Sequence, residues 1–186
     1  MVQVVAGVEW SRLMQIVTCT YDAHAGEILA ILNDAIRHTT ALYDYRPREI
    51  ESMREWFSAK ADGRYPVLGA VGEAGGLLGF ASYGAFRAWP AYKYTVEHSV
   101  YVHRAHRGRG IGRELMRRLI AVAADQGYHV LVGGIDAANG GSIAFHQALG
   151  FVHAGTVREV GFKFGRWLDL AFYQLVLDGP EAPEDE

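Results

Sequence analysis

The clearest alternation of apolar and polar positions in this chain lies between Thr95 and Val102. Valines fall on one side of an extended segment and polar or aromatic residues on the other, namely Val96, Val100 and Val102 against Glu97, Ser99 and Tyr101. Alternation with a period of two predicts a strand with one buried face. From Ile111 onward the apolar positions recur three and four residues apart, which predicts a helix.

The same analysis of the remaining chain predicts further strands and helices. Strands are expected over residues 15–20, 66–72, 77–86, 129–135, 151–164 and 167–177, and helices over 22–38, 47–60 and 143–149. The first helix is expected to have Asp22 as its N-cap, and the second to carry Pro47 in its first turn. No repeat or linker separates these elements, so one domain is expected at residues 15–177, between an extension at 1–14 and an acidic tail at 178–186.

Two loops carry side chains suited to a pocket. Residues 39–46 combine hydroxyl groups with Tyr43 and Tyr45, and such a loop either lines a pocket or packs its tyrosines against the core. Residues 87–93 cannot continue the preceding strand because Pro90 lacks an N–H group. They are expected to form a loop that leads into the central strand beside a cleft.

Composition and charge narrow the class of protein. With 186 residues, 50% of them hydrophobic, the chain is long enough to bury a sizeable core. Its net charge of −3 gives no overall field for nucleic acid, so the arginines between 107 and 118 are interpreted as a local anion site. No apolar run approaches the ~20 residues of a membrane span, and the first residues lack the features of a secretory signal. A single cysteine, Cys19, favours a reducing compartment, so we expect a cytoplasmic protein with no membrane or nucleic-acid partner.

The segment Arg107–Gly112 joins the predicted strand to the predicted helix and has the composition of a phosphate-binding loop. Glycines let the backbone approach an anion, and the first unpaired N–H groups of the helix point toward it. Arg107, Arg109 and Arg113 add full positive charges beside those amides. The segment lacks the Lys-Ser/Thr ending of a P-loop, and Arg113 occupies the place of the third glycine in a dinucleotide-binding loop. We therefore expect a different ligand that carries several phosphate oxygens.

The spacing Arg-x-x-Gly-x-Gly resembles the pyrophosphate loop of the Gcn5-related N-acetyltransferases, which bind acetyl-CoA. The phrase N-G-G-S-I-A-F-H-Q-A-L-G-F, residues 139–151, is similar to the second cofactor helix of that family, at a separation of roughly 30 residues. The order of predicted elements is also the family's. The resemblance implies an α/β fold of the α+β kind, with a mixed, mostly antiparallel central sheet flanked by helices. It implies acetyl-CoA as the acetyl donor and no metal.

Longer phrases resemble the phosphinothricin and methionine sulfoximine N-acetyltransferases, which acetylate the α-amino group of free amino acids and analogues. These phrases are F-R-A-W from Phe86, T-V-E-H-S-V-Y-V-H from Thr95 and V-G-F-K-F-G-R-W-L-D-L from Val160. The phosphinothricin enzymes have a histidine where this chain has Leu168. That departure favours the methionine sulfoximine and methionine sulfone type, also called L-amino acid N-acyltransferases, and leaves phosphinothricin turnover open. The resemblance also implies a homodimer with the substrate pocket near the subunit boundary.

Carried onto this sequence, the resemblance assigns contacts to both substrates. The amino acid is expected at Arg87, Ala88, Trp89, Glu97, His98 and Ser99. Acetyl-CoA is expected at Val100, Tyr101, Val102, Arg107, Gly108, Arg109, Gly110, Ile111, Gly112, Arg113, Asn139 and Ser142. Many relatives have a tyrosine at the position of His146, which makes His146 the candidate general acid; the alternative is a helix histidine satisfied locally.

The expected chemistry is direct attack of an amine on a thioester, which requires a base because a free amino acid is mostly ammonium near neutral pH. Glu97 is the candidate base. A carboxylate in the middle of a strand is costly to desolvate, so we expect such a group to be retained for a function. The alternative is a structural carboxylate bonded to Arg87 or Lys93. The N–H group of Val100 or Val102 suits the oxyanion if the strand separates from its neighbour there. Arg87 is the candidate for the substrate α-carboxylate, because a guanidinium binds a carboxylate at two points.

Two rival functions stay open on the sequence alone. An N-acetyltransferase for an antibiotic, a polyamine or a peptide N-terminus would keep the same donor, and the first two acceptors call for further carboxylates beside Glu97. A non-catalytic acyl-CoA-binding module would bind acetyl-CoA without releasing CoA. The histidines do not have the spacing of a metal-ligand set, so no metal site is assigned.

Overall fold

The computed structural model describes residues 14–185, so the extension predicted at 1–14 lies outside the described residues except for Met14. The elements are β1 (Met14–Thr18), α1 (Tyr21–His38), α2 (Ile50–Asp62), β2 (Val67–Gly72), β3 (Leu77–Ala85), η2 (Pro90–Tyr92), β4 (Thr95–Val102), η3 (Arg104–His106), α3 (Ile111–Asp125), β5 (Val130–Asp136), α4 (Gly140–Gln147), β6 (Val152–Lys163) and β7 (Arg166–Val176). Apart from the two short 3₁₀ turns η2 and η3, this is the order predicted from the sequence.

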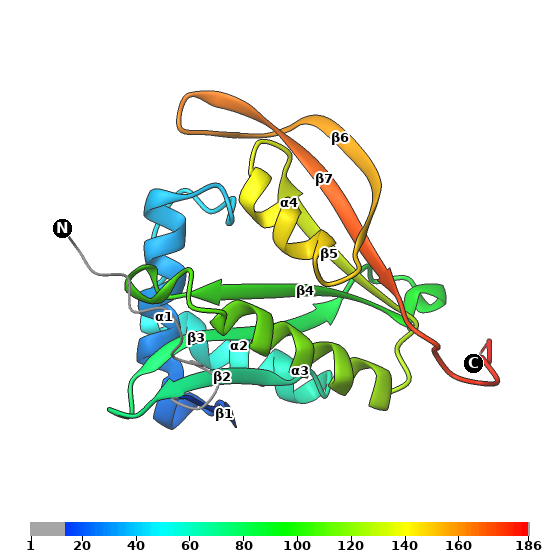
Figure 1. Cartoon of the computed structure of the whole chain (residues 1–186), viewed down its shortest axis with the longest axis horizontal. Helices are drawn as coiled ribbons and strands as arrows, with labels where there is room; N and C mark the ends of the chain where they lie inside the picture. The colour runs from blue at the N-terminus through cyan, green and yellow to red at the C-terminus, as the bar shows by residue number, and fades with distance from the viewer. Residues whose placement is uncertain (1–13, 186) are drawn as a thin grey trace.

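The strands form one seven-stranded sheet in the order β1-β2-β3-β4-β5-β7-β6 (Figure 1). Every neighbouring pair is antiparallel except β4 and β5, which are parallel. A parallel pair requires a crossover connection, and α3 provides it. The mixed, mostly antiparallel sheet implied by the family resemblance is therefore confirmed.

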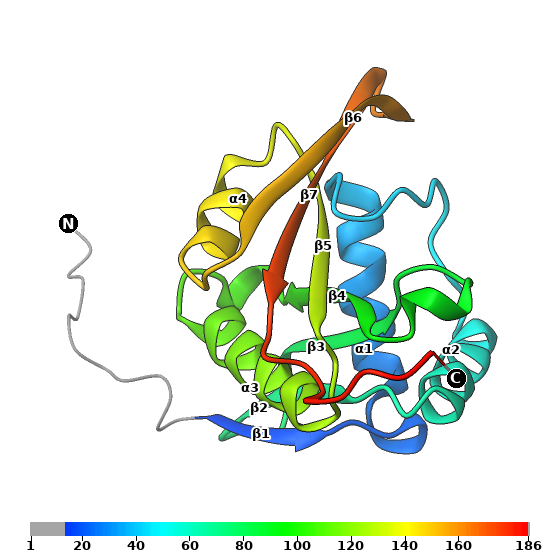
Figure 2. The same ribbon diagram turned by 90° about the vertical axis from the view of Figure 1, so that its right-hand side faces the viewer.

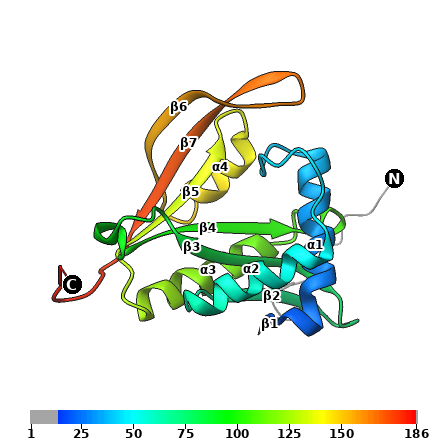
Figure 3. The same ribbon diagram turned by 180° about the vertical axis from the view of Figure 1, so that it is seen from behind.

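Helices cover both faces of this sheet. α1 and α2 lie on one face (Figure 3), and α3 and α4 lie on the other (Figure 1). Most apolar positions that helical spacing picked out are buried, namely Ile28, Leu32 and Ile36 in α1 and Ile111, Leu115 and Leu119 in α3, whereas Leu29 and Val122 are half-buried. Because side chains alternate along β4, Val96 joins the core under α3 and Tyr101 packs against the core under α1. β4 therefore sends functional side chains to both faces.

The starts of the first two helices differ from the sequence predictions. The N-cap of α1 is Thr20, whose hydroxyl accepts from the Ala23 N–H group, and Asp22 lies in the first turn. α2 begins at Ile50, so Pro47 belongs to the preceding loop rather than to the helix. The cause is a pair of hydrogen bonds between the Asn33 side chain and the backbone N–H and carbonyl groups of Arg48. They hold this segment extended along α1 and delay the second helix.

The hairpin of β6 and β7 extends past the rest of the sheet (Figure 2). Its turn uses Phe164 and Gly165, both with positive φ. The pairing shifts between Val157 and Gly161, where the Glu159 N–H group donates to the carboxylate of Asp169 at 2.8 Å. Such an irregularity bends the bulged strand.

Candidate active site

The centre of the candidate site is the place where β4 and β5 separate. These two strands pair only between Thr95–Glu97 and 130–132, although β4 continues to Val102 and β5 to Asp136. Beyond Glu97 the strands diverge (Figure 1). The sheet is therefore split along half of its central strand.

Backbone donors of β4 point into this split. The N–H group of His103 donates to the Leu78 carbonyl of β3 at 2.8 Å, and backbone groups along an antiparallel ladder alternate in direction. The N–H groups of Val100 and Val102 therefore point away from β3, toward the edge that β5 has left. The Tyr94 carbonyl, which accepts from the β5 side, follows the same alternation. The separation that an oxyanion site requires is present.

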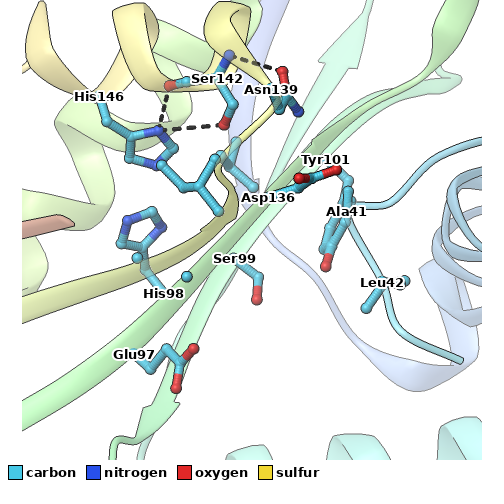
Figure 4. Close-up of a pocket in the computed structure, with 14 residues that line it drawn as sticks. Ala41, Leu42, Glu97, His98, Ser99, Tyr101, Asp136, Asn139, Ser142 and His146 are labelled. Carbon is cyan, nitrogen blue, oxygen red and sulfur yellow. Dashed lines mark hydrogen bonds between the residues drawn. The ribbon is translucent and has the colours of Figure 1, made fainter. Parts of the chain in front are cut away.

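A cavity of about 220 Å³ occupies the split (Figure 4). Residues predicted for the two substrates and for the proton transfers line it together: Glu97, His98, Ser99, Val100, Tyr101, Asn139, Ser142 and His146. The loop after α1 also reaches it, through Ala41 and Leu42. The loop was predicted either to line a pocket or to pack its tyrosines. Ala41 and Leu42 line the cavity, whereas Tyr43 packs against the β6–β7 hairpin.

Glu97 lies at the point where the strands part, and a glycine makes room for it. A Cβ atom on Gly134 of β5 would lie 3.2 Å from Glu97 Oε1, closer than an ordinary contact. Burial raises the pKa of the Glu97 carboxyl, and the nearby Arg87 guanidinium partly opposes that rise. A half-buried carboxylate with a raised pKa is the state expected of a general base. Lys93, the other partner considered from the sequence, makes no ion pair with Glu97 among residues 14–185.

On the other face of β4, His98 stacks on His146 of α4 with ring centroids 5.1 Å apart. Nδ1 of His146 donates to the Ser142 carbonyl at 2.7 Å, so the neutral ring carries its lone pair on Nε2. That Nε2 and both nitrogens of His98 are buried without a hydrogen-bond partner among the described residues. A Cβ atom on Gly133 would lie 2.8 Å from His98 Nε2 and 3.4 Å from His146 Nε2. The two rings thus converge on a second glycine.

Burial lowers the pKa of both imidazoles. The pKa of His98 falls to about 3, with His146 adding to the effect. The pKa of His146 is also lowered by burial, although the bond to the Ser142 carbonyl opposes the shift. Both rings are therefore neutral near pH 7, and His146 presents an acceptor rather than a proton to the cavity.

The phosphate loop predicted at Arg107–Gly112 has the required backbone. Gly108 and Gly110 have φ values of +76° and +79°, and Gly110 is the N-cap of α3 with no side-chain hydrogen bond to the first turn. A Cβ atom on either glycine would meet no other atom within 4 Å, so the space in front of the helix N-terminus is open. Open amides at a helix start are a place for an anion. The residues present therefore fit a ligand that carries phosphates.

Arginines surround this loop, and two of them contact α1. Arg107 donates through Nε to the Val102 carbonyl and lies 3.9 Å from the Asp34 carboxylate, which Arg104 also approaches at 3.6 Å. Arg109 lies beside His106, and Arg113 projects exposed from the first turn of α3. The loop therefore presents guanidinium groups next to its free amides.

The predicted acceptor contacts before β4 lie outside the cavity. Arg87, Ala88 and Trp89 are exposed, with 74% of Trp89 accessible. Arg87 donates to the Phe86 carbonyl and packs over the Phe86 ring, yet it is close enough to affect Glu97. The structure brings Arg87 to the edge of the site and leaves Trp89 away from it.

Three further cavity-lining positions lie in β5, and the sequence patterns did not single them out. Gly133 and Gly134 accommodate His98 and Glu97 on opposite faces, and Asp136 closes the far end of the cavity. Adjacent glycines inside a predicted strand are the signal that was available, because such glycines mark a close approach by another group.

Within residues 14–185, no group of three or more His, Cys, Asp or Glu side chains could hold a metal ion. None of the helices in that range is both long enough and apolar enough to cross a membrane.

A glycine loop at the start of α3, beside a parted pair of parallel strands with a carboxylate at the parting, is the arrangement expected of an acetyltransferase. The model of the acetyltransferase (GNAT) family matches residues 28–151, and this chain belongs to that family.

Relatives and solved structures agree over most of the chain. An L-methionine sulfoximine/L-methionine sulfone acetyltransferase from Pseudomonas paraeruginosa PA7 is 48% identical over 151 residues, which are 81% of this chain and 88% of that protein. The structure of an N-acetyltransferase from Staphylococcus aureus Mu50 is 49% identical, has a TM-score of 0.83, and covers 88% of this chain and 98% of its own. A phosphinothricin acetyltransferase from Sinorhizobium meliloti, in complex with acetyl-CoA, is 32% identical, with a TM-score of 0.87 and 92% of each chain covered.

Proposed function

We propose that this chain is an acetyl-CoA-dependent N-acetyltransferase whose acceptors are free L-amino acids and their analogues, methionine sulfoximine and methionine sulfone among them. The observation that carries the proposal is the cavity at the parted β4–β5 edge, where a half-buried carboxylate and free backbone donors lie together. Gly112 packs against Val102 and Phe145, so the phosphate loop adjoins the same split. The acceptor class is supported by the Pseudomonas paraeruginosa relative.

Each side chain then has a defined task. Glu97 takes a proton from the ammonium group of the acceptor, directly or through water, which is worth roughly 10² to 10⁴ in rate. The N–H groups of Val100 and Val102 stabilise the oxyanion. His146 remains our candidate donor to the departing thiolate. Its Nδ1–H group is held by the Ser142 carbonyl and its ring is neutral, so Nε2 first accepts the extra proton that the acceptor nitrogen still carries after attack on the thioester. It then passes this proton to the departing thiolate sulfur.

Arg87 is proposed to bind the acceptor α-carboxylate. It lies at the edge of the site, and its charge is near enough to Glu97 to lower the pKa of that carboxyl against the effect of burial. Leu168, which replaces the histidine of the phosphinothricin enzymes, is fully buried in β7. It adds no polar group to the site. We therefore propose methionine sulfone and methionine sulfoximine as better acceptors than phosphinothricin.

The rival acceptors are less well supported. Polyamines and aminoglycoside-like antibiotics call for further free carboxylates beside the base. The other carboxylate of the cavity, Asp136, is already bonded to Thr40 and Arg166. Asp44 is likewise paired with Arg48.

A homodimer is proposed through the tip of the β6–β7 hairpin. This tip exposes large apolar side chains, namely Val157, Val160, Phe162, Phe164 and Trp167. A contiguous exposed apolar surface on a projecting hairpin suits a second copy of the chain. The cytoplasm is the proposed compartment, because the single cysteine is buried and unpaired.

A thiol-release assay with acetyl-CoA tests the function. Methionine sulfone, methionine sulfoximine, phosphinothricin, spermidine and several natural amino acids are compared at one concentration, and light scattering gives the oligomeric state. We expect turnover with the two methionine derivatives above all others. Turnover with spermidine alone, or bound acetyl-CoA with no release of CoA for any amine, would contradict the proposal.

A further inference from the structure

The loop between α1 and α2 (residues 39–49) is held down by the β6–β7 hairpin, although more than a hundred residues separate them in the chain. The main contact is Lys163, at the end of β6, whose side chain is only 4% exposed. Its Nζ atom donates to the carbonyl groups of Thr39 and Leu42, at 2.9 and 2.5 Å. A buried ammonium group is costly unless it is well hydrogen-bonded. Its partners here are two carbonyl groups of the loop, so these hydrogen bonds hold the loop in position.

A second contact joins the same loop, the hairpin and the end of β5. Asp136 accepts from the Thr40 hydroxyl at 2.6 Å and from Arg166 at 2.7 Å, while its other oxygen accepts from the Ala138 N–H group at 3.0 Å. Burial raises the pKa of this carboxyl, but the three hydrogen bonds and the Arg166 charge outweigh burial and lower it. The carboxylate is therefore charged at neutral pH and holds both partners. We call Lys163, Arg166 and Asp136 the clasp.

Packing supports the clasp. The Tyr45 hydroxyl donates to the Phe162 carbonyl at 2.7 Å. The Tyr43 ring lies against β6 at Gly161, where a Cβ atom would come within 2.7 Å of the ring. Gly161 ends the irregular stretch of β6, so the bend brings the tip of the hairpin onto the loop.

What the clasp fixes is one wall of the cavity. Ala41 and Leu42 lie in the held loop and line the cavity (Figure 4), on the side of β4 that carries Ser99 and Tyr101. Glu97 points to this same side, because it alternates with them along the strand. The phosphate loop leads into α3, on the opposite face of the sheet, and its Arg107 meets the α1 side at Asp34, within the helix, rather than at residues 39–42. A change in the loop wall should therefore reach the acceptor and leave the donor's phosphates untouched.

We propose that Lys163, together with Arg166 and Asp136, is a positioning residue for the acceptor: by holding residues 39–42 it fixes the Ala41–Leu42 wall against which the amino acid side chain binds. This inference rests on the proposed function for the nature of the acceptor. It assigns acceptor affinity to a lysine that does not line the cavity. Without Lys163, two loop carbonyls lose their donor and the wall is free to move.

Two variants test the proposal from different directions. Lys163→Met keeps the aliphatic stem and removes the donors, whereas Gly161→Ala keeps every charge and pushes the Tyr43 ring off β6. Arg158→Met is the control, because Arg158 is exposed on the same strand and has no side-chain hydrogen bond or ion pair within residues 14–185. Lys163→Arg, which retains donors, should recover part of the loss. If Lys163→Met fails to fold, Gly161→Ala carries the test.

The measurements are KM for methionine sulfone, Kd for acetyl-CoA by calorimetry, and deuterium uptake of loop peptides. We expect KM to rise roughly tenfold in both variants, which corresponds to about 1.4 kcal/mol. Kd for acetyl-CoA should stay within about twofold, and faster exchange should be confined to residues 39–46. Unchanged KM despite faster exchange, or an equal loss of acetyl-CoA affinity, overturns the proposal. Absence of turnover in the unmodified protein would contradict the proposed function rather than the clasp. Unaltered deuterium uptake of the loop in both variants would contradict the clasp, whatever the activity.

Discussion

Replacement of Glu97 by glutamine should lower activity and at the same time leave the fold as stable as before or more so. Glutamine keeps the size of the side chain, but its amide cannot act as a base. Because a positioned base contributes about 10² to 10⁴ in rate, kcat/KM for methionine sulfone should fall by that factor. At about 1.4 kcal/mol per tenfold, the loss amounts to about 3–5 kcal/mol of transition-state stabilisation.

The stability of the variant follows from the raised pKa. Burial makes the folded-state pKa of Glu97 higher than its unfolded value, with Arg87 opposing. The stabilising contribution of the protonated form is complete below the unfolded pKa and is lost as pH rises through the folded pKa. At pH 7 the ionised group is thus a cost to folding, and the neutral glutamine removes that cost. The free energy of unfolding should therefore hold or rise.

The assay combines a pH profile with unfolding. In the unmodified enzyme, the acid limb of kcat/KM should lie above the ordinary glutamate pKa, because Glu97 must be ionised to act. In Glu97→Gln that limb should disappear, leaving only the ionisation of the acceptor amine. A variant with near-native kcat/KM would show that Glu97 is not the base. A strong loss of stability at pH 7 would show instead that Glu97 is a structural partner of Arg87.

Three further substitutions and one control test the site and its support. Gly134→Ala would place a Cβ atom 3.2 Å from Glu97 Oε1, which should displace the carboxylate and reduce kcat/KM about tenfold. The control is Gly26→Ala, whose Cβ meets nothing within 4 Å; it should leave activity unchanged and stabilise α1 by about 0.5–1 kcal/mol in thermal unfolding. Gly110→Ala forces a Cβ into a φ of +79°, so it should cost about 1–2 kcal/mol and raise Kd for acetyl-CoA in calorimetry. Asp136→Asn should cost about 1–3 kcal/mol at pH 7. Because the folded pKa of Asp136 lies below its ordinary 3.8, that deficit should shrink in denaturant titrations as pH falls through and below this value.

Local patterns were enough to predict the elements and their order. Alternation over Thr95–Val102 and helical spacing after Ile111 are properties of neighbouring residues. Burial followed the helical spacing, whereas in β4 only Val96 and His98 are buried and Val100 and Val102 are half-buried. The helix starts were less predictable, because Thr20 and Asp22 both suit an N-cap and only the geometry selects Thr20. The delay of α2 past Pro47 depends on Asn33, a contact across fifteen positions that no local rule contains.

The site itself was predicted in part. The resemblance to the acetyltransferases placed most cavity residues in β4 and α4, but it gave no view of what holds them in place. Lys163 looks like an exposed lysine at the end of a strand, and its burial follows from a bend in β6 and the approach of a distant loop. Likewise, the role of the adjacent glycines of β5 can be recognised only in the structure, where Gly133 lies beside His98 and Gly134 beside Glu97.

The short pairing of β4 with β5 divides the sheet into two blades, β1–β4 and β5-β7-β6, that meet along a seam of three residue pairs. Loss of one of these three residue pairs would widen the gap between β4 and β5 without unfolding either part of the sheet. These three pairs therefore set how far the two parts of the sheet stand apart at the cavity.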